Sequence, residues 1–448
     1  MKQHTLVGLR LIRLALFWIT GNLTICFFCW NIAAGWEIAI GIVSGLAFLF
    51  CQFAHPHIIA GERRLASLAH GCSLLRTGAI WFCLELLTAG WLLCFSAVPW
   101  WILLIDFSTF GLLLWFTIFH SLLHIALHST QVKFPWHLAL FFLWWMPVLN
   151  LILTIHIYRT AKHELQLESA KAECNAIRKE TEICKTKYPI LLVHGIFFRD
   201  WQFFNYWGRI PSELIRNGAS IFYGRQQSAQ SVSDSARELA VQIEAVCKAA
   251  GTEKVNIIAH SKGGLDCRCA MQEYGAAKYV ASLTTINTPH HGCSFVDDLL
   301  QKVPDNAARW IAERYNHIFR KLGDQNPDFL TGVQELTAEN CRKFNEDHPC
   351  LPGVAYLTVM SRMRSAFSAP FPLWLGYLLN KRRSGENDGL VPVSSAKLEN
   401  VPFLMVPDAG RRGISHGDMI DLNRENIPGF DVREWYSQLV QRLKQNGF

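Results

Sequence analysis

The first 158 residues of this chain are poor in charge, because they carry only 11 of its 79 charged side chains (seven Lys or Arg and four Asp or Glu). Apolar runs fill this region, each long enough to cross a hydrocarbon core of about 30 Å. They lie near residues 11–32, 36–54, 78–99, 108–127 and 137–157. A removable signal peptide is excluded, since one apolar run follows another. We therefore predict an all-α transmembrane domain of about five helices.

Other patterns are also missing, and each absence argues against a class of function. The chain has no glycine-rich phosphate loop and no basic-aromatic pattern of the kind that binds nucleic acid. None of its 14 cysteines forms a pair that has both zinc-site spacing and suitable partners. Cys267 and Cys269, for example, are too close together for the usual zinc knuckle. The net charge of +7 is modest and suits an anionic lipid surface.

The most informative pattern that is present is a turn around Ser261, which joins an apolar, strand-like run to a helix-like run. A serine at such a junction is typical of a nucleophile elbow, a turn so tight that nearby residues must be small. Ala259 and Gly263 meet that condition, and His260 and Lys262 flank the serine. An ordinary glycine-rich turn has the same letters, so the prediction that Ser261 is a nucleophile depends on its partners.

An upstream turn contains the groups needed to stabilise an oxyanion. Residues 188–193 are predicted to form a buried strand that ends in His194 and Gly195. Acyl transfer places negative charge on a carbonyl oxygen, which preorganised backbone N–H groups stabilise. We expect the N–H groups of Ile196 and of Lys262, the residue after the nucleophile, to form this oxyanion hole.

Two downstream residues complete the set. Asp388 lies in an Asp-Gly segment and His416 lies near the C-terminus. Alone, the first also fits a common turn, and the second also fits a surface histidine. The chain order Ser261, Asp388, His416 favours catalysis, because it is the order of the triad in α/β-hydrolases. We expect His416 to act as the base and Asp388 to orient it.

These motifs resemble those of the bacterial triacylglycerol lipases, over residues 188 to about 440. The segments that carry the resemblance are Leu191–Ile196, Asn205–Pro211, Val255–Asp266, Ile286–Gly292, Asn387–Val391 and His416–Asp418. The resemblance implies an α/β-hydrolase fold, a serine esterase activity with the triad named above, and no organic cofactor.

The resemblance also raises the question of calcium. Many of these lipases hold a structural calcium ion, and Asp418 matches one of its ligands. A second aspartate is expected about twenty residues before Asp388, but residues 351–387 contain no aspartate. Asp418 also fits a carboxylate at the start of a helix. Lys262 stands where many relatives have an uncharged residue or histidine, and we expect its charge to favour anionic substrates.

The sequence predicts three regions. A transmembrane helical domain covers 1–158, a charged helical linker 159–187, and an α/β-hydrolase domain 188–448 with a cap or lid at about 295–385. Strands expected at 219–223, 254–259, 279–286 and 403–406 alternate with helices, which implies a mostly parallel sheet with helices on both faces.

The chain is thus predicted to be an integral protein of the bacterial inner membrane that cleaves esters of glycerolipids. With five spanning helices, the distribution of Lys and Arg favours a catalytic domain outside the cytoplasm, and one helix fewer reverses that side. An acyltransferase, a phospholipase with the same triad and a non-catalytic membrane scaffold remain alternatives. The lipid bilayer is the expected partner, and nucleic acid is not.

Overall fold

The computed structural model describes residues 3–54, 62–95, 98–196, 206–227, 229–293, 296–297, 300, 304–321 and 324–448. Parts of three expectations lie outside the described residues, namely 96–97 of the third apolar run, Asn205 of the segment Asn205–Pro211, and 295, 298–299, 301–303 and 322–323 of the cap. The chain divides into two compact units, Met1–Ile177 and Arg178–Phe448.

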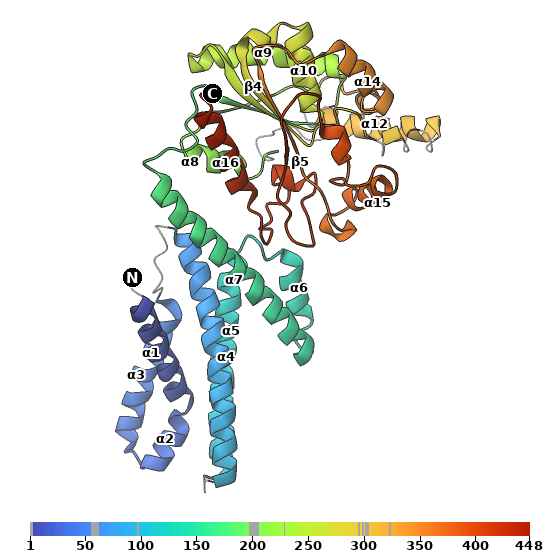
Figure 1. Ribbon diagram of the computed structural model, residues 1–448. Helices are drawn as coiled ribbons and strands as arrows, with labels where there is room; N and C mark the ends of the chain where they lie inside the picture. The colour runs from blue at the N-terminus through green and yellow to red at the C-terminus, as the bar shows by residue number, and fades with distance from the viewer. Residues whose placement is uncertain are drawn as a thin grey trace. The chain divides into compact units, whose positions relative to one another are not determined.

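The first unit is helical, as its apolar runs predict (Figure 1). Its helices are α1 (Gln3–Gly21), α2 (Leu23–Trp30), α3 (Ala34–Phe53), α4 (Arg63–Phe95), α5 (Trp100–His128), α6 (Phe134–Phe142) and α7 (Pro147–Arg178). Aromatic rings hold several of them together, and the ring centroids of Phe17 and Phe48 lie 4.8 Å apart. Trp81 packs against both rings from α4.

Among the described residues, three helices are long and apolar enough to cross a membrane: Gly35–Phe53, Arg63–Phe95 and Trp100–His128. A fourth candidate is the pair Gly8–Gly21 and Leu23–Trp30, which is bent by 64°. The expected fifth run, 137–157, is divided between α6 and α7 and is not a candidate span. The expected helical linker begins inside α7, which continues without a break to Arg178.

The second unit contains a six-stranded sheet in the order β2-β1-β3-β4-β5-β6. Its strands are β1 (Ile190–Val193), β2 (Ile221–Tyr223), β3 (Val255–His260), β4 (Val280–Ile286), β5 (Ala355–Met360) and β6 (Phe403–Met405). All neighbouring pairs are parallel, for example Leu191 opposite Ile257. This arrangement confirms the expected parallel sheet.

Helices cover both faces of this sheet, because alternate residues of each buried strand point to opposite sides. Leu191 and Val193 pack into one core cluster with residues of α9 and α10. Ile190 and Leu192 pack into a second cluster with residues of α8 and α16 (Figure 1). The helices of this unit are α8 (Ile210–Arg216), α9 (Val232–Ala250), α10 (Gly263–Glu273), α12 (Asp305–Lys321), α13 (Phe329–Gln334), α14 (Ala338–Asp347), α15 (Leu373–Arg383) and α16 (Val432–Gln445), with the 3₁₀ turns η1 (Ala276–Tyr279), η2 (Ala366–Ser368), η3 (Val393–Ala396) and η4 (Asp418–Ile420).

The expected cap at 295–385 needs a correction. Strand β5 lies within that range and pairs with β4 and β6, so it is part of the central sheet. The Ala355–Met360 segment is apolar and β-branched enough to form a strand, although it belongs to none of the lipase-like motifs. Helices α12 to α14 precede β5, and α15 follows it.

Candidate active site

Ser261 lies in a strained turn between β3 and α10. Its φ is +55°, a left-handed value that non-glycine residues adopt rarely and mostly at functional sites. The Ser261 N–H donates to the carbonyl of Ile286 on β4 at 2.9 Å, which ties the turn to the sheet. Gly263 begins α10, and a Cβ there would collide with the carbonyl oxygen of His194. Close packing therefore requires glycine at position 263.

The turn after β1 packs directly on this elbow. A Cβ added to Gly195 would lie 2.7 Å from the Cβ of Ser261, so only glycine fits. Ile196, the next residue, and Lys262 at the N-terminus of α10 are both buried. Within the described residues, neither of their backbone N–H groups has a hydrogen-bond acceptor. In the part of the chain that the structure describes, both N–H groups are therefore available as hydrogen-bond donors.

Tyr206 joins the two turns, and the sequence did not single it out. Its hydroxyl oxygen accepts from the Gly195 N–H at 3.1 Å and lies 2.7 Å from His260 Nδ1. Since the hydroxyl accepts from one group, its proton is available for the other. The only sequence signal was its position inside the Asn205–Pro211 segment, and it lies far along the chain from His260.

Asp388 and His416 lie in contact, in loops that follow α15 and β6. His416 Nδ1 is 2.6 Å from Asp388 Oδ2, and the backbone N–H of His416 donates to the backbone carbonyl of Asp388 at 2.9 Å. Asp388 is fully buried, and its Oδ1 accepts from the N–H groups of Leu390 and Val391 at 2.9 and 2.8 Å. A carboxylate can only accept here, so Nδ1 carries the proton and Nε2 is left as a base.

His260 places the imidazole of His416 close to the elbow. The two ring centroids are 4.5 Å apart, and His260 immediately precedes Ser261. Burial, together with the neighbouring His416, holds the pKa of His260 well below its usual range. His260 is therefore neutral, and a neutral ring does not oppose the positive charge that His416 gains when it accepts a proton.

The expectation that Lys262 attracts anionic substrates is wrong. The side chain is 1% exposed and its Nζ lies 2.7 Å from Asp266 Oδ1, with the Ser235 hydroxyl at 3.1 Å. Lys262 and Asp266 are four residues apart, so both lie on the buried side of the first turn of α10. The ammonium group neutralises a buried carboxylate, and only the backbone of Lys262 belongs to the site.

We predict that Lys262→Met destabilises the protein without changing its preference between anionic and neutral esters. The loss should be about 3 kcal/mol at pH 8, since Asp266 would be left buried without its partner. Burial raises the pKa of Asp266 to about 6 in the native protein. A carboxyl with a raised native pKa contributes stability below its unfolded pKa and loses it as pH rises through the native pKa. At pH 5 Asp266 is mostly protonated and neutral, so the loss of stability caused by Lys262→Met should be smaller than at pH 8.

Unfolding curves at both pH values test this, with Lys248→Met as the control, because Lys248 pairs with Glu244 on an exposed helix surface. Equal stability of the two variants would contradict the prediction, as would a changed preference for charged esters.

Calcium does not fit the residues around Asp418. Arg412 already pairs with both oxygens of this carboxylate, at 2.7 and 3.1 Å. The Ser415 N–H donates to the same group at 2.8 Å. The Asp418 oxygens already accept hydrogen bonds from the Arg412 guanidinium and the Ser415 N–H. The positive charge of the guanidinium would also repel a calcium ion at this place. Asp418 begins the short turn η4, which agrees with the alternative of a carboxylate at a helix start.

A group of metal-ligating side chains does occur elsewhere in the described part of the chain. Ligand atoms of Cys269, Glu273 and His348 lie within 4.8 Å of one another. His348 Nδ1 lies 2.9 Å from the Phe344 carbonyl, and its Nε2 lies 3.0 Å from Glu273 Oε1. Both ring nitrogens of His348 thus already face oxygen atoms of the protein, and these contacts need no metal ion.

Comparisons with known proteins match the second unit. A family described as palmitoyl protein thioesterase matches residues 189–327. A triacylglycerol lipase of Vibrio cholerae serotype O1 is 30% identical over 289 residues, which cover 59% of this chain and 89% of that protein. A triacylglycerol lipase of Pseudarthrobacter phenanthrenivorans is 32% identical over 177 residues, which cover 37% of this chain and 54% of that protein.

The chain spans about half the length of the first two curated relatives it matches. Among solved structures, the mature form of the Bacillus licheniformis lipase BlEst2 is 23% identical, with a TM-score of 0.42. That match covers 53% of this chain and 88% of the lipase.

Proposed function

This chain belongs to the triacylglycerol lipase family of ester-hydrolysing serine hydrolases, and from that premise we propose that its second unit cleaves carboxylic esters of glycerolipids through Ser261, His416 and Asp388. The observation that carries the proposal is the 2.6 Å contact between His416 Nδ1 and the buried Asp388 carboxylate. This contact fixes the tautomer in which Nε2 acts as a general base towards a serine hydroxyl.

In the proposed reaction, Ser261 Oγ attacks the ester carbonyl carbon while His416 Nε2 accepts the hydroxyl proton. The N–H groups of Ile196 and Lys262 stabilise the oxyanion that forms. The bond to the alcohol then breaks, and His416 returns the proton to that alcohol. Water, deprotonated by the same nitrogen, then attacks the acyl-enzyme. The bond between the acyl carbon and Ser261 Oγ breaks, His416 returns the proton to Oγ, and a carboxylic acid is released. Asp388 stabilises the imidazolium in both halves of the reaction.

The first unit supplies the proposed membrane anchor. Its candidate spans expose large apolar side chains that lipid would cover, among them Leu46, Phe95 and Trp115. Burial of such surface in hydrocarbon stabilises insertion, by about 25 cal/mol for each Å² removed from water. An anchored esterase stays at the interface where glycerolipid esters are concentrated.

We further propose that the catalytic unit lies on the cytoplasmic side. Arg63 and Arg64 stand at the start of α4, and Lys133 follows α5, so these charges flank one end of the two spans. Residues 96–99 at the opposite end contain no Lys or Arg, and the positive-inside rule favours the charged end as cytoplasmic. The chain continues from that end into the catalytic unit, since 137–157 is not a candidate span. All fourteen cysteines are free, which agrees with a reducing compartment.

The side of the membrane can be tested with reporter fusions to the C-terminus in a bacterial host. We expect a green fluorescent protein fusion to fluoresce and an alkaline phosphatase fusion to be inactive, because the first folds in the cytoplasm and the second outside it. The same pair of fusions after Phe95 should give the opposite result. An active phosphatase at the C-terminus would place the catalytic unit outside.

The substrate class is tested with the full-length protein in detergent and lipid mixed micelles. A long-chain triacylglycerol and a phosphatidylcholine are supplied in turn, and the products are identified by mass spectrometry. The proposal predicts free fatty acid from the glyceride. Acyl groups found only on an added alcohol would indicate a transferase, and release only from the phospholipid would indicate a phospholipase. Absence of all three activities would overturn the enzymatic proposal.

A further inference from the structure

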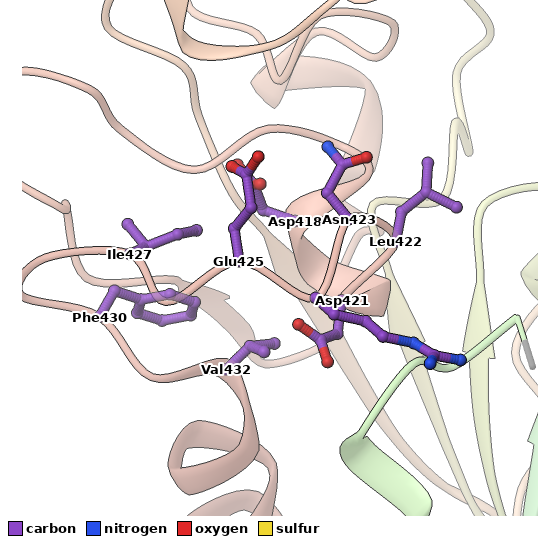
Figure 2. Close-up of a pocket in the computed structure, with 9 residues that line it drawn as sticks. Asp418, Asp421, Leu422, Asn423, Glu425, Ile427, Phe430 and Val432 are labelled. Carbon is purple, nitrogen blue, oxygen red and sulfur yellow. The ribbon is translucent and has the colours of Figure 1, made fainter. Parts of the chain in front are cut away.

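The loop that carries His416 has little regular structure to hold it in place. It connects β6 to α16 over residues 406–431, and we refer to it as the histidine loop. Apart from η4 and the isolated β-bridges of Gly413 with Met363 and of Ile427 with Phe430, it forms turns and irregular backbone. Three carboxylates follow the histidine, from Asp418, Asp421 and Glu425, and all three line one pocket (Figure 2). Three neighbouring negative charges repel each other unless cations lie between them.

Arg412 supplies one of those cations from within the histidine loop. Its guanidinium binds Asp418 through two nitrogens, at 2.7 and 3.1 Å, and its Nη2 lies 3.5 Å from Glu425 Oε2. The Asp418 side chain is only 4% exposed, so this pair is poorly screened by water. The Ser415 N–H adds a third bond to Asp418, next to the histidine itself. Arg412, which precedes His416, is thus bonded to Asp418 and Glu425, which follow it.

Arg209 supplies the second cation and links the histidine loop to the body of the unit. Its Nε and Nη2 donate to the Asp421 carboxylate at 2.7 and 2.8 Å, and its Nη1 donates to Asn426 at 2.7 Å. The backbone N–H of Arg209 also donates to Asp421 Oδ2 at 2.8 Å. Arg209 caps α8, which packs on the sheet through Ile210 and Leu214. The loop is therefore fastened to a rigid element by a bidentate ion pair.

We infer that Arg412, supported by Arg209, is a positioning residue that replaces a bound cation and holds His416 against Asp388. The inference rests on the proposed function for the role of His416, while the bracing itself rests on the ion pairs. It accounts for a buried Asp418 carboxylate beside the histidine without a calcium site. A guanidinium is covalently part of the chain, so chelators cannot remove it. Catalysis and stability should consequently be independent of calcium.

Removal of Arg412 should create a need for calcium. In Arg412→Ala, Asp418 and Glu425 lose their shared cation, and oxygen-rich clusters of this kind bind Ca²⁺ in the millimolar range when unoccupied. We expect kcat to fall about tenfold with KM little changed, and the apparent Tm to fall by about 5 °C. About 5 mM CaCl₂ should restore much of both quantities in this variant. Neither CaCl₂ nor EDTA should affect the wild-type protein.

Three further variants sharpen the test. Arg411→Ala is the matched control, because the neighbouring Arg411 is exposed and should behave as wild type. Arg412→Lys should recover part of kcat, since one ammonium cannot make the bidentate contact. Arg412→Ala combined with Asp418→Asn should no longer respond to CaCl₂, because the ligand is gone.

The measurements separate this inference from the proposed function. Thermal shifts report the bracing even if no esterase activity is found, and esterase activity is measured independently of calcium. The inference fails if EDTA lowers the wild-type Tm or activity and CaCl₂ restores it, since that would reveal a true calcium site. It also fails if Arg412→Ala behaves as Arg411→Ala does. If calcium restores Tm in Arg412→Ala but not kcat, the loop is braced without positioning the histidine.

Discussion

Ser261→Ala should lower esterase turnover at least about 10⁴-fold, because no other group can form the acyl-enzyme and only binding and oxyanion stabilisation remain. The fold should be retained. Ser261 is buried in a turn whose backbone strain is the same for alanine, and its backbone bond to Ile286 does not involve the side chain. The expected variant is thus folded, inserted in the membrane and inactive.

The measurement is labelling of the detergent-solubilised protein by a fluorophosphonate probe, alongside hydrolysis of a soluble ester. Wild type and Ser233→Ala should both be labelled, because Ser233 lies on the exposed surface of α9 and bonds to Tyr274. Ser261→Ala should remain unlabelled with an unchanged circular dichroism spectrum. Retained turnover in the folded Ser261→Ala protein would sink the proposed mechanism.

Asp388→Asn should lower kcat about 10³- to 10⁴-fold while KM changes little. The amide oxygen can still accept from the N–H groups of Leu390 and Val391, so the loop should keep its shape. Its NH₂ group would then face His416 Nδ1 and donate to it, which forces the ring proton onto Nε2. A protonated Nε2 cannot accept the proton of Ser261, so the base is lost although every residue remains in position.

Steady-state kinetics on a soluble ester test this, with Asp347→Asn as the control. Asp347 is exposed at the end of α14, remote in sequence from the triad, and its replacement should leave kcat unchanged. The predicted loss should persist at every pH between 6 and 9, because the wrong tautomer is not corrected by titration. A variant with more than a tenth of wild-type kcat would show that Asp388 does not orient the base.

Several features of the catalytic unit follow from local sequence. Residues 255–259 are mostly apolar and lead into the turn around Ser261, and the structure has the strand, the strained turn and the helix in that order. The C-terminus of α9 also follows from local sequence, because the helix ends at Gly251, which adopts a left-handed C-cap. Such features depend on residues within a few positions of each other.

Other features could not be read from local pattern. Strand β5 lies inside the expected cap and was not predicted as a strand. Its pairing partners, β4 and β6, are far from it along the chain, so no nearby turn residues indicate the pairing. The expected run at 137–157 is equally apolar along its length, yet α6 ends at Phe142 and α7 begins at Pro147. Proline at the first position of a helix is favourable, which agrees with the start of a new helix at Pro147.

Residue types and their order along the chain predict the chemistry proposed for this protein: a serine in an elbow, an acid and a histidine in triad order, and an apolar region that can enter a bilayer. Which charges meet depends on how the whole unit folds. Lys262 turns inward to Asp266, Asp418 binds Arg412, and Asp421 binds Arg209 across the unit. Ion pairs form wherever folding brings opposite charges together at low dielectric. The four-residue spacing of Lys262 and Asp266 permits their contact, but packing buries it, and no spacing along the chain brings Arg209 to Asp421.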